Sequence, residues 1–148
     1  MLTLEAGEPS SLGFCLTLTV LASPFALCRL AAAEPVPEWT ALARTFLTIS
    51  RSATELSIVA DETAVPAQMR AERGYRAIRV DGPLPLDLVG IVAGLASPLA
   101  AAAVPIFPIA TYDTDYVLVR GDVLARAVAA LGAAGHNVVF EANPEPAP

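Results

Sequence analysis

The stretch that most constrains the fold is residues 80–119, which read VDGPLPLDLVGIVAGLASPLAAAAVPIFPIATYDTDYVLV. The pattern predicts a strand that ends at a Gly-Pro turn, a long apolar helix, and two short strands joined by a polar turn. The helix is expected to begin at an N-cap Asp87 and to bend or break at Pro98, which cannot donate to the Gly94 carbonyl. The side chains that could recognise another molecule therefore lie mostly in the two polar breaks of this unit.

The chain also contains a degenerate internal repeat. Residues 46–62 (FLTISRSATELSIVADE) align with residues 107–122 (FPIATYDTDYVLVRGD) when one extra residue is allowed in the first copy. Gly74 follows the first copy at nearly the distance at which Gly135 follows the second. Each copy then reads βαββαβ, an order typical of an antiparallel sheet with two helices on one face.

The repeat predicts the domain organisation. The fold class is α+β, with two tandem modules that each form a ferredoxin-like βαββαβ sandwich with an antiparallel sheet. The second face of each sheet needs cover, and side-by-side pairing of the modules with dimerisation would supply it. The predicted modules are residues 12–74, a degenerate copy, and residues 75–141, with flexible tails at residues 1–11 and 142–148.

The apolar stretch at residues 14–33 is interpreted as a pair of strands rather than a signal peptide or membrane span. No basic residue precedes it, and the segment LTLTV alternates with period 2. The strands are expected at residues 12–21 and 25–30, joined by a turn at Ser23-Pro24. Further along, a helix is expected at residues 63–73, followed by Gly74 at its C-terminal end.

Composition narrows the classes of function. The net charge of −6 disfavours nucleic-acid binding, which needs clustered cations. Cys15, Cys28 and His136 lack the spacing of a metal site, so the cysteines are interpreted as core thiols in a reducing, cytoplasmic compartment. The chain has no GxSxG motif, P-loop or nucleophile–His–acid set. We therefore expect no catalytic residue, metal or cofactor, and no membrane association.

The segment that begins GPLPLDLVGIVAGLASPLA at Gly82 and continues to TYDTDY at residues 111–116 resembles the second module of tandem ACT-domain proteins of the CASTOR type. TYDTDY is its most specific piece. Ala110 departs from the family pattern, in which Ser precedes TYDTDY, and Leu86-Asp87 stands where Phe-Ser is common. The resemblance covers about residues 12–141 and implies tandem ACT modules that sense or bind an amino acid.

Two groups of residues form the predicted binding site. The first turn of a helix offers unpaired backbone N–H groups to a carboxylate, and a glycine there lets a ligand approach the backbone. In the turn that follows, a hydroxyl and a carboxylate suit an α-ammonium group. In the arginine-sensing relatives, the positions that match the turn contact the ligand. The predicted ligand-binding residues are Asp87, Leu88, Gly90, Ile91, Thr111, Tyr112 and Asp115.

The same residues also have purely structural interpretations. Asp87 can cap the helix, Gly90 can serve close helix packing, and Asp115 can belong to a simple polar turn. In the first copy of the repeat, where Ser50, Arg51 and Glu55 are the equivalent residues, Arg51 can meet a ligand carboxylate or simply be a solvated turn charge. Two functions stay open: a homodimeric regulatory protein that binds an amino acid or related metabolite, and a ligand-free module whose sheet face binds protein.

Overall fold

The structure, a computed structural model, describes residues 14–143. The predicted tail at residues 1–11, and all but the first two residues of the predicted tail at 142–148, lie outside the described range. The chain divides into two compact units. The small unit is Ser23–Tyr75, and the large unit combines the residues before Ser23 with those after Tyr75. Strands β1 (Thr17–Leu30) and β4 (Glu72–Val80) contribute residues to both units.

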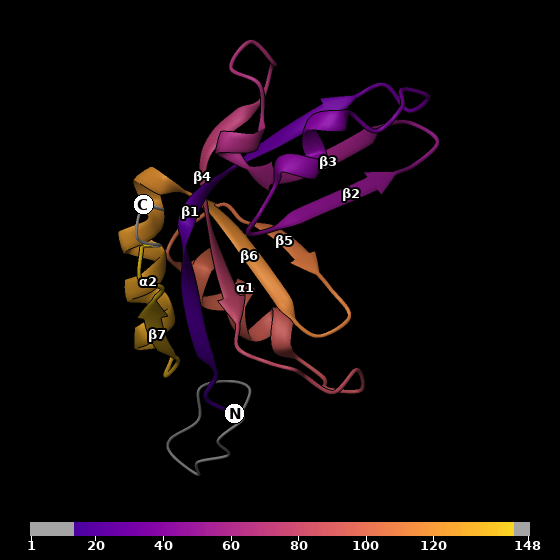
Figure 1. Cartoon of the computed structure of the whole chain (residues 1–148). Helices are drawn as coiled ribbons and strands as arrows, with labels where there is room; N and C mark the ends of the chain where they lie inside the picture. Colours follow the sequence, from indigo (N-terminus) through magenta and orange to yellow (C-terminus); the bar gives the residue numbers. More distant parts are fainter. Residues whose placement is uncertain (1–13, 144–148) are drawn as a thin grey trace. The chain divides into compact units, whose positions relative to one another are not determined.

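The large unit has the βαββαβ order predicted for the second module. After β4 come α1 (Ile91–Ala101), β5 (Phe107–Ala110), β6 (Asp115–Arg120), the short 3-10 helix η3 (Gly121–Val123), α2 (Leu124–Ala133) and β7 (Asn137–Phe140). The strands follow the order β7-β1-β4-β6-β5 (Figure 1). The first residues of β1 therefore lie between β7 and β4, and they pair in parallel with β7.

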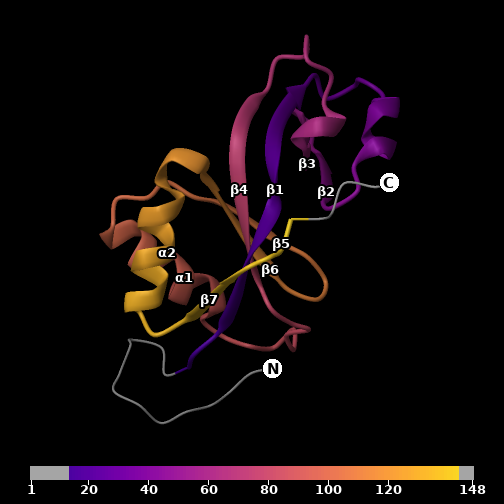
Figure 2. The same cartoon turned by 60° about the vertical axis from the view of Figure 1, so that its left-hand side comes forward.

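Helices α1 and α2 lie together on one side of the large unit's strands (Figure 2). The reason is visible in the spacing of the apolar residues, which alternate along each strand and recur every three or four positions on each helix. The buried core that they form consists of Leu16, Leu18, Val20, Ile78, Val80, Ile91, Leu95, Leu99, Val104, Val117, Val119, Ala127 and Leu131.

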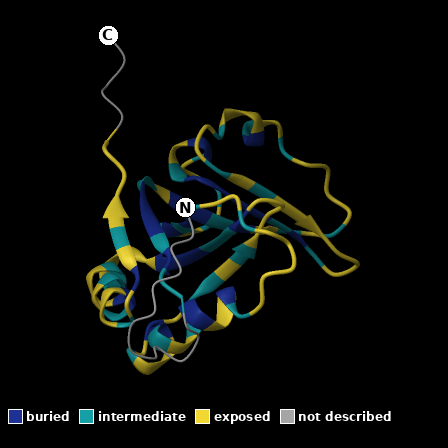
Figure 3. Ribbon diagram, turned by 90° about the horizontal axis from the view of Figure 1, so that it is seen from below, coloured by how far each residue is buried: buried dark blue, intermediate teal, exposed yellow. Residues whose placement is uncertain are grey.

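The small unit is a curled three-stranded arrangement in the order β2-β3-β1. Its other elements are η1 (Glu38–Leu42), β2 (Leu47–Arg51), β3 (Leu56–Asp61) and η2 (Glu62–Ala64). Its core is smaller and is covered by Trp39 and Met69 rather than by a long helix. Figure 3 shows burial concentrated in the strands, while the connecting loops are largely exposed.

The predicted turn at Ser23-Pro24 is wrong, because β1 runs through both residues as a single strand. Pro24 has no N–H to donate, but it lies just outside the ladder with β3, which begins at Phe25. The proline therefore does not interrupt the ladder with β3.

Cys15 and Cys28 lie along the same extended segment, and both are free thiols. Burial raises the pKa of the Cys28 thiol, although the positive charge of Arg73 acts to lower it.

The predicted helix at residues 63–73 is also wrong. The segment contains only the 3-10 turn η2, a turn in which the Met69 N–H donates to the Pro66 carbonyl, and the start of β4 at Glu72. Pro66 explains the failure, because its ring and missing N–H disrupt a continuing helix. Both hairpins of the repeat are present, but the described residues 14–74 contain no α-helix.

The helix of the opening stretch begins later than expected. Gly90, rather than Asp87, is the N-cap of α1, and it adopts a left-handed conformation with φ 89° that favours glycine. Asp87 is exposed in the preceding loop, where the Leu88 N–H already donates to the Pro85 carbonyl at 3.2 Å. Pro98 lies inside α1 without interrupting it, since the helix continues to Ala101.

Candidate functional site

A pocket of about 420 Å³ lies in the large unit between two segments. One wall is formed by residues of the loop between β4 and α1 together with the first turn of α1, within residues 84–93. The other wall is the end of β5, the turn after it and the start of β6, at residues 110–115. Both segments can be followed in Figure 1. The two polar breaks of the opening stretch therefore face one pocket.

The loop wall is anchored at its start and its middle. The N–H of Asp81 donates to the Thr17 carbonyl at 2.9 Å, and the Asp81 carboxylate accepts the Thr19 hydroxyl at 2.7 Å. Three residues later, the Leu84 N–H donates to the Asp113 carbonyl at 2.7 Å. This last bond ties the loop directly to the opposite wall, so the width of the pocket is fixed by backbone contacts.

The turn wall is held by threonine side chains. The Thr111 hydroxyl donates to the Thr114 carbonyl at 2.9 Å and accepts the Thr114 N–H at 3.2 Å. The Thr114 hydroxyl in turn donates to the Val80 carbonyl at 2.5 Å. The Thr111 oxygen keeps one lone pair for a ligand, because a hydroxyl accepts two hydrogen bonds.

The chemistry of the pocket is asymmetric. The first turn of α1 carries the N–H groups of Ile91, Val92 and Ala93, which have no intrahelical partner, and no side chain caps them. The other wall includes two acidic residues, Asp113 and Asp115. None of the residues described as lining this pocket is Lys, Arg or His. One end therefore favours an anion and the other a cation.

The structure brings most of the predicted site residues together. Leu88, Gly90, Ile91, Thr111, Tyr112 and Asp115 all line the pocket, whereas Asp87 does not. Tyr112 is 81% exposed and lies at the rim.

Sequence reasoning missed several lining residues. Asp113 is not among the predicted ligand-binding residues, although it lies between Thr111 and Asp115 in the most specific motif of the chain and lines the pocket. Leu84 and Leu86 belong to the loop after the Gly82-Pro83 turn, and their proximity to the motif depends on the Leu84–Asp113 backbone bond. A local pattern carries no signal for such a bond.

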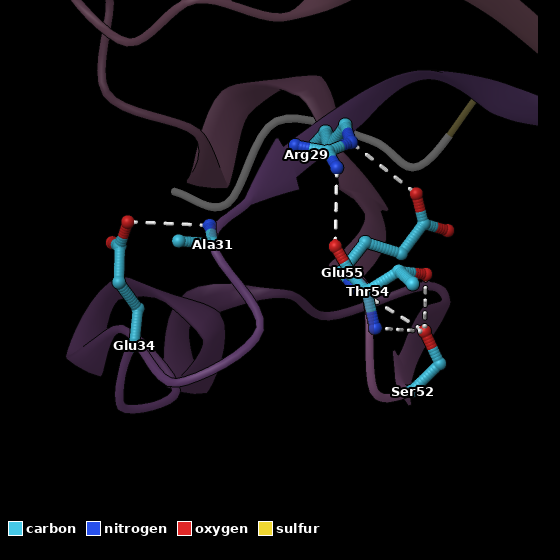
Figure 4. Close-up of polar contacts among 6 residues, drawn as sticks. All are labelled: Arg29, Ala31, Glu34, Ser52, Thr54 and Glu55. Carbon is cyan, nitrogen blue, oxygen red and sulfur yellow. Dashed lines mark hydrogen bonds and ion pairs between the residues drawn. The ribbon is translucent and has the colours of Figure 1, made fainter.

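In the small unit, the hairpin β2–β3 is the equivalent of β5–β6, and its polar side chains bond to neighbouring residues of the same unit. Figure 4 shows Arg29 reaching the turn between β2 and β3, where it donates to the Thr54 carbonyl at 3.1 Å and pairs with Glu55 at 3.3 Å. Arg51 donates to the carbonyl of Ala32. These charges lie on an exposed surface and serve turn contacts, which agrees with their structural interpretation.

Two further properties bear on the site. Within residues 14–143, no group of three or more His, Cys, Asp or Glu side chains is placed to hold a metal ion. None of the helices in that part of the chain combines the length and the apolar character that crossing a membrane requires.

Replacing Gly82 with alanine is expected to destabilise the pocket. An added Cβ would lie 3.1 Å from both the Asp113 oxygen and the Leu84 nitrogen, so backbone atoms would have to move. We expect the free energy of unfolding, measured by urea denaturation, to fall by about 1–3 kcal/mol. Gly132→Ala is the matched control, since nothing lies within 4 Å of its Cβ position. Equal stability of the two variants would contradict this packing.

Comparisons with known proteins identify the two parts of the chain. A family model described as an ACT domain matches residues 70–133, and another, described as an N-terminal domain, matches residues 23–68. The crystal structure of Atu0741 from Agrobacterium tumefaciens is similar with 32% identity and a TM-score of 0.82, over 90% of this chain and 98% of that chain. Among curated proteins, no match to the sequence is found.

More distant structures share the fold. VC0802 from Vibrio cholerae, described as a protein of unknown function and possible transport protein, has 20% identity and a TM-score of 0.67 over 81% of this chain and 90% of that chain. The regulatory subunit of aspartate kinase from Thermus flavus has 13% identity and a TM-score of 0.55, over 81% of this chain and 98% of that chain. The match to Atu0741 and the family model define the family: the chain belongs to the same protein family as Atu0741, and residues 70–133 form an ACT domain.

Proposed function

We propose that the protein is a regulatory module that binds an amino acid, or a closely related metabolite, in the pocket between residues 84–93 and 110–115. The observation that carries the proposal is the pairing of a free helix N-terminus with two carboxylates across one pocket. The N–H groups at the start of α1 would bind the ligand's α-carboxylate. The Asp115 carboxylate and the remaining lone pair of Thr111 would bind its ammonium group.

The family supports this role. ACT domains bind amino acids and commonly form dimers, and one structural relative is the regulatory subunit of an aspartate kinase. We further propose that the chain is a CASTOR-type protein with tandem ACT modules, in which residues 12–74 are the degenerate first module. The matching hairpins β2–β3 and β5–β6 support that descent. The free thiols of Cys15 and Cys28 support a cytoplasmic location.

A second copy of the chain is the proposed partner. Large apolar side chains are exposed around the pocket: Leu86 is 74% exposed, Val89 87% and Tyr112 81%. A cluster of this kind on a protein surface marks an interaction site more often than an isolated exposed residue does. In a homodimer these side chains would be buried and would close the open side of the pocket over the ligand.

Calorimetric titration with each of the twenty amino acids tests the proposal. We expect at least one to bind, and Asp115→Asn to weaken its binding by about 1–3 kcal/mol through loss of a charge-assisted hydrogen bond. Asp122→Asn is the matched control, because it removes the same charge from an exposed carboxylate outside the pocket, 3.8 Å from Arg120. Equal weakening by both variants would point to a general charge effect and against a specific contact.

The alternative is a module without a small ligand, in which the same apolar surface binds a protein. The exposure of Leu86, Val89 and Tyr112 is the observation that favours it. The calorimetric titration distinguishes amino-acid binding from protein binding without a small ligand. Binding of no amino acid at millimolar concentration, together with an intact dimer, would support the alternative and overturn ligand binding.

A further inference from the structure

We propose that His136 is a positioning residue for the first turn of α1, and that it can bridge this turn to the start of β1 only when its imidazole is neutral. The turn from Gly90 to Gly94 forms one end of the pocket. His136 lies outside the pocket, in the connection between α2 and β7, and is only 8% exposed. That this turn binds a ligand rests on the proposed function. That His136 holds the turn in place does not depend on it.

Pro98 creates the need for this contact. In a regular helix, the N–H of residue 98 would donate to the carbonyl of Gly94, but proline has no N–H. The Gly94 carbonyl therefore lacks its helical donor, and Gly94 is buried. The ring nitrogen Nε2 of His136 lies 3.3 Å from that carbonyl oxygen. His136 thus replaces the hydrogen bond that the helix has lost, which explains why α1 continues through Pro98.

The second ring nitrogen defines the protonation state. The backbone N–H of Leu16 donates to Nδ1 of His136 at 3.2 Å, so Nδ1 carries no proton. The proton of the neutral ring must then be on Nε2, where it is donated to the Gly94 carbonyl. The imidazole therefore bridges the start of β1 and the first turn of α1. The Asn137 N–H donates to the Leu16 carbonyl at 2.9 Å, so both backbone polar groups of Leu16 are hydrogen-bonded.

Protonation of the ring removes one side of the bridge. A proton on Nδ1 would face the Leu16 N–H, and two donors cannot bond each other. A ring rotation that relieved this conflict would move Nε2 away from Gly94.

Among the described residues, 14–143, no carboxylate pairs with the His136 ring. The elements that carry or pack against His136 are the start of β1, α1, α2 and β7, and among their residues in the large unit the one charged side chain is Arg126. Its guanidinium donates to the Ala103 carbonyl at 3.1 Å. Beyond β7, the Glu141 carboxylate accepts the Ala22 N–H at 3.0 Å, and before β1 the nearest titratable group is the Cys15 thiol. A buried charge without a paired carboxylate is costly, so the bridged state belongs to the neutral ring.

The contact reaches the pocket within a single turn. The Gly94 N–H donates to the Gly90 carbonyl at 2.9 Å, and the residues between them, Ile91 to Ala93, line the pocket. A hydrogen bond at the Gly94 carbonyl therefore fixes the segment whose N–H groups would meet the ligand's carboxylate. Loss of that bond should loosen the first turn while leaving the rest of α1 seated on the core.

Two substitutions separate the sides of the bridge. In His136→Gln the amide nitrogen can take the place of Nε2 and donate to Gly94. In His136→Asn the shorter amide can take the place of Nδ1 and accept from Leu16, but it does not reach Gly94. By amide hydrogen exchange, we expect Gly94 and Leu95 to exchange about tenfold faster in His136→Asn than in the wild type, and near the wild-type rate in His136→Gln.

A pH titration followed by NMR gives the second readout. As the pH is lowered, the amides of Leu16 and of residues 91–95 should shift with one common midpoint. That midpoint should equal the midpoint of the His136 ring, and the transition should vanish in His136→Gln. Amides 91–95 that stay unchanged while the ring titrates, or equal exchange in both variants, would overturn the proposal. Neither readout needs a ligand, so failure of the amino-acid titration leaves this test standing.

Discussion

Replacing Asp61 with alanine is expected to lower the free energy of unfolding by about 2–4 kcal/mol at neutral pH. Asp61 is 4% exposed, and one of its carboxylate oxygens accepts the N–H groups of Arg44 at 2.7 Å and Thr45 at 2.9 Å. Alanine would leave these donors without a partner at the point where the chain enters β2. Urea denaturation of the wild type and the variant measures the difference.

The loss should depend on pH. Burial acts to raise the pKa of Asp61, but hydrogen bonds from the Thr45 hydroxyl and from the N–H groups of Thr45, Arg44 and Phe46 outweigh it and lower the pKa. A lowered pKa contributes stability that is present above the unfolded value of about 3.9 and is lost as the pH falls through the folded value. The difference between wild type and Asp61→Ala should therefore shrink below about pH 4.

Asp61→Asn is the matched control for this effect. Its amide keeps one oxygen acceptor for the Arg44 and Thr45 N–H groups but has no charge and does not titrate. We expect a smaller loss than for alanine, without the acid dependence. A difference between wild type and Asp61→Ala that stayed constant down to about pH 2 would show that the carboxylate is not held in its charged form.

Replacing Val89 with glutamate is expected to convert the proposed homodimer to monomers. Val89 is 87% exposed in the single chain, so the substitution should leave the stability of the monomer nearly unchanged. In the dimer it would bury an unpaired carboxylate, which should weaken association by about 100-fold or more. Sedimentation velocity over a range of protein concentrations measures the effect.

Val36→Glu is the matched control for the dimer. The same substitution is made at an apolar residue of the small unit that is 42% exposed. We expect it to leave association intact. A wild-type chain that is monomeric at all concentrations, or a Val89→Glu variant that associates as the wild type does, would remove this surface from the proposed dimer interface.

The fold of the large unit was predictable because its local signals agree with one another. Alternating apolar residues at 16–20 and a short apolar run at 117–119 define strands, and the longer apolar run of α1 defines a helix. The TYDTDY motif predicted the β5–β6 turn, and residues of both polar breaks line the pocket at residues 84–93 and 110–115.

The errors arose where tertiary contacts override a local pattern. Ser23-Pro24 has the composition of a turn, yet β1 passes through it because its two halves pair with different strands. Asp87 is a good N-cap type, but Gly90 can adopt the left-handed conformation that starts α1. The sequence did predict that Pro98 would leave the Gly94 carbonyl without a donor. That His136 would supply one could not be read from a local pattern, because the two residues are 42 positions apart.

The most direct test of ligand binding is an NMR titration of the labelled protein with each of the twenty amino acids. We predict that a small number of them will shift the amides of residues 91–93 and 111–115 in a saturable way. Changes in these two segments should follow one binding curve, because both walls would contact the same molecule. The absence of saturable shifts with every amino acid, or shifts confined to the small unit around Trp39, would contradict binding in this pocket.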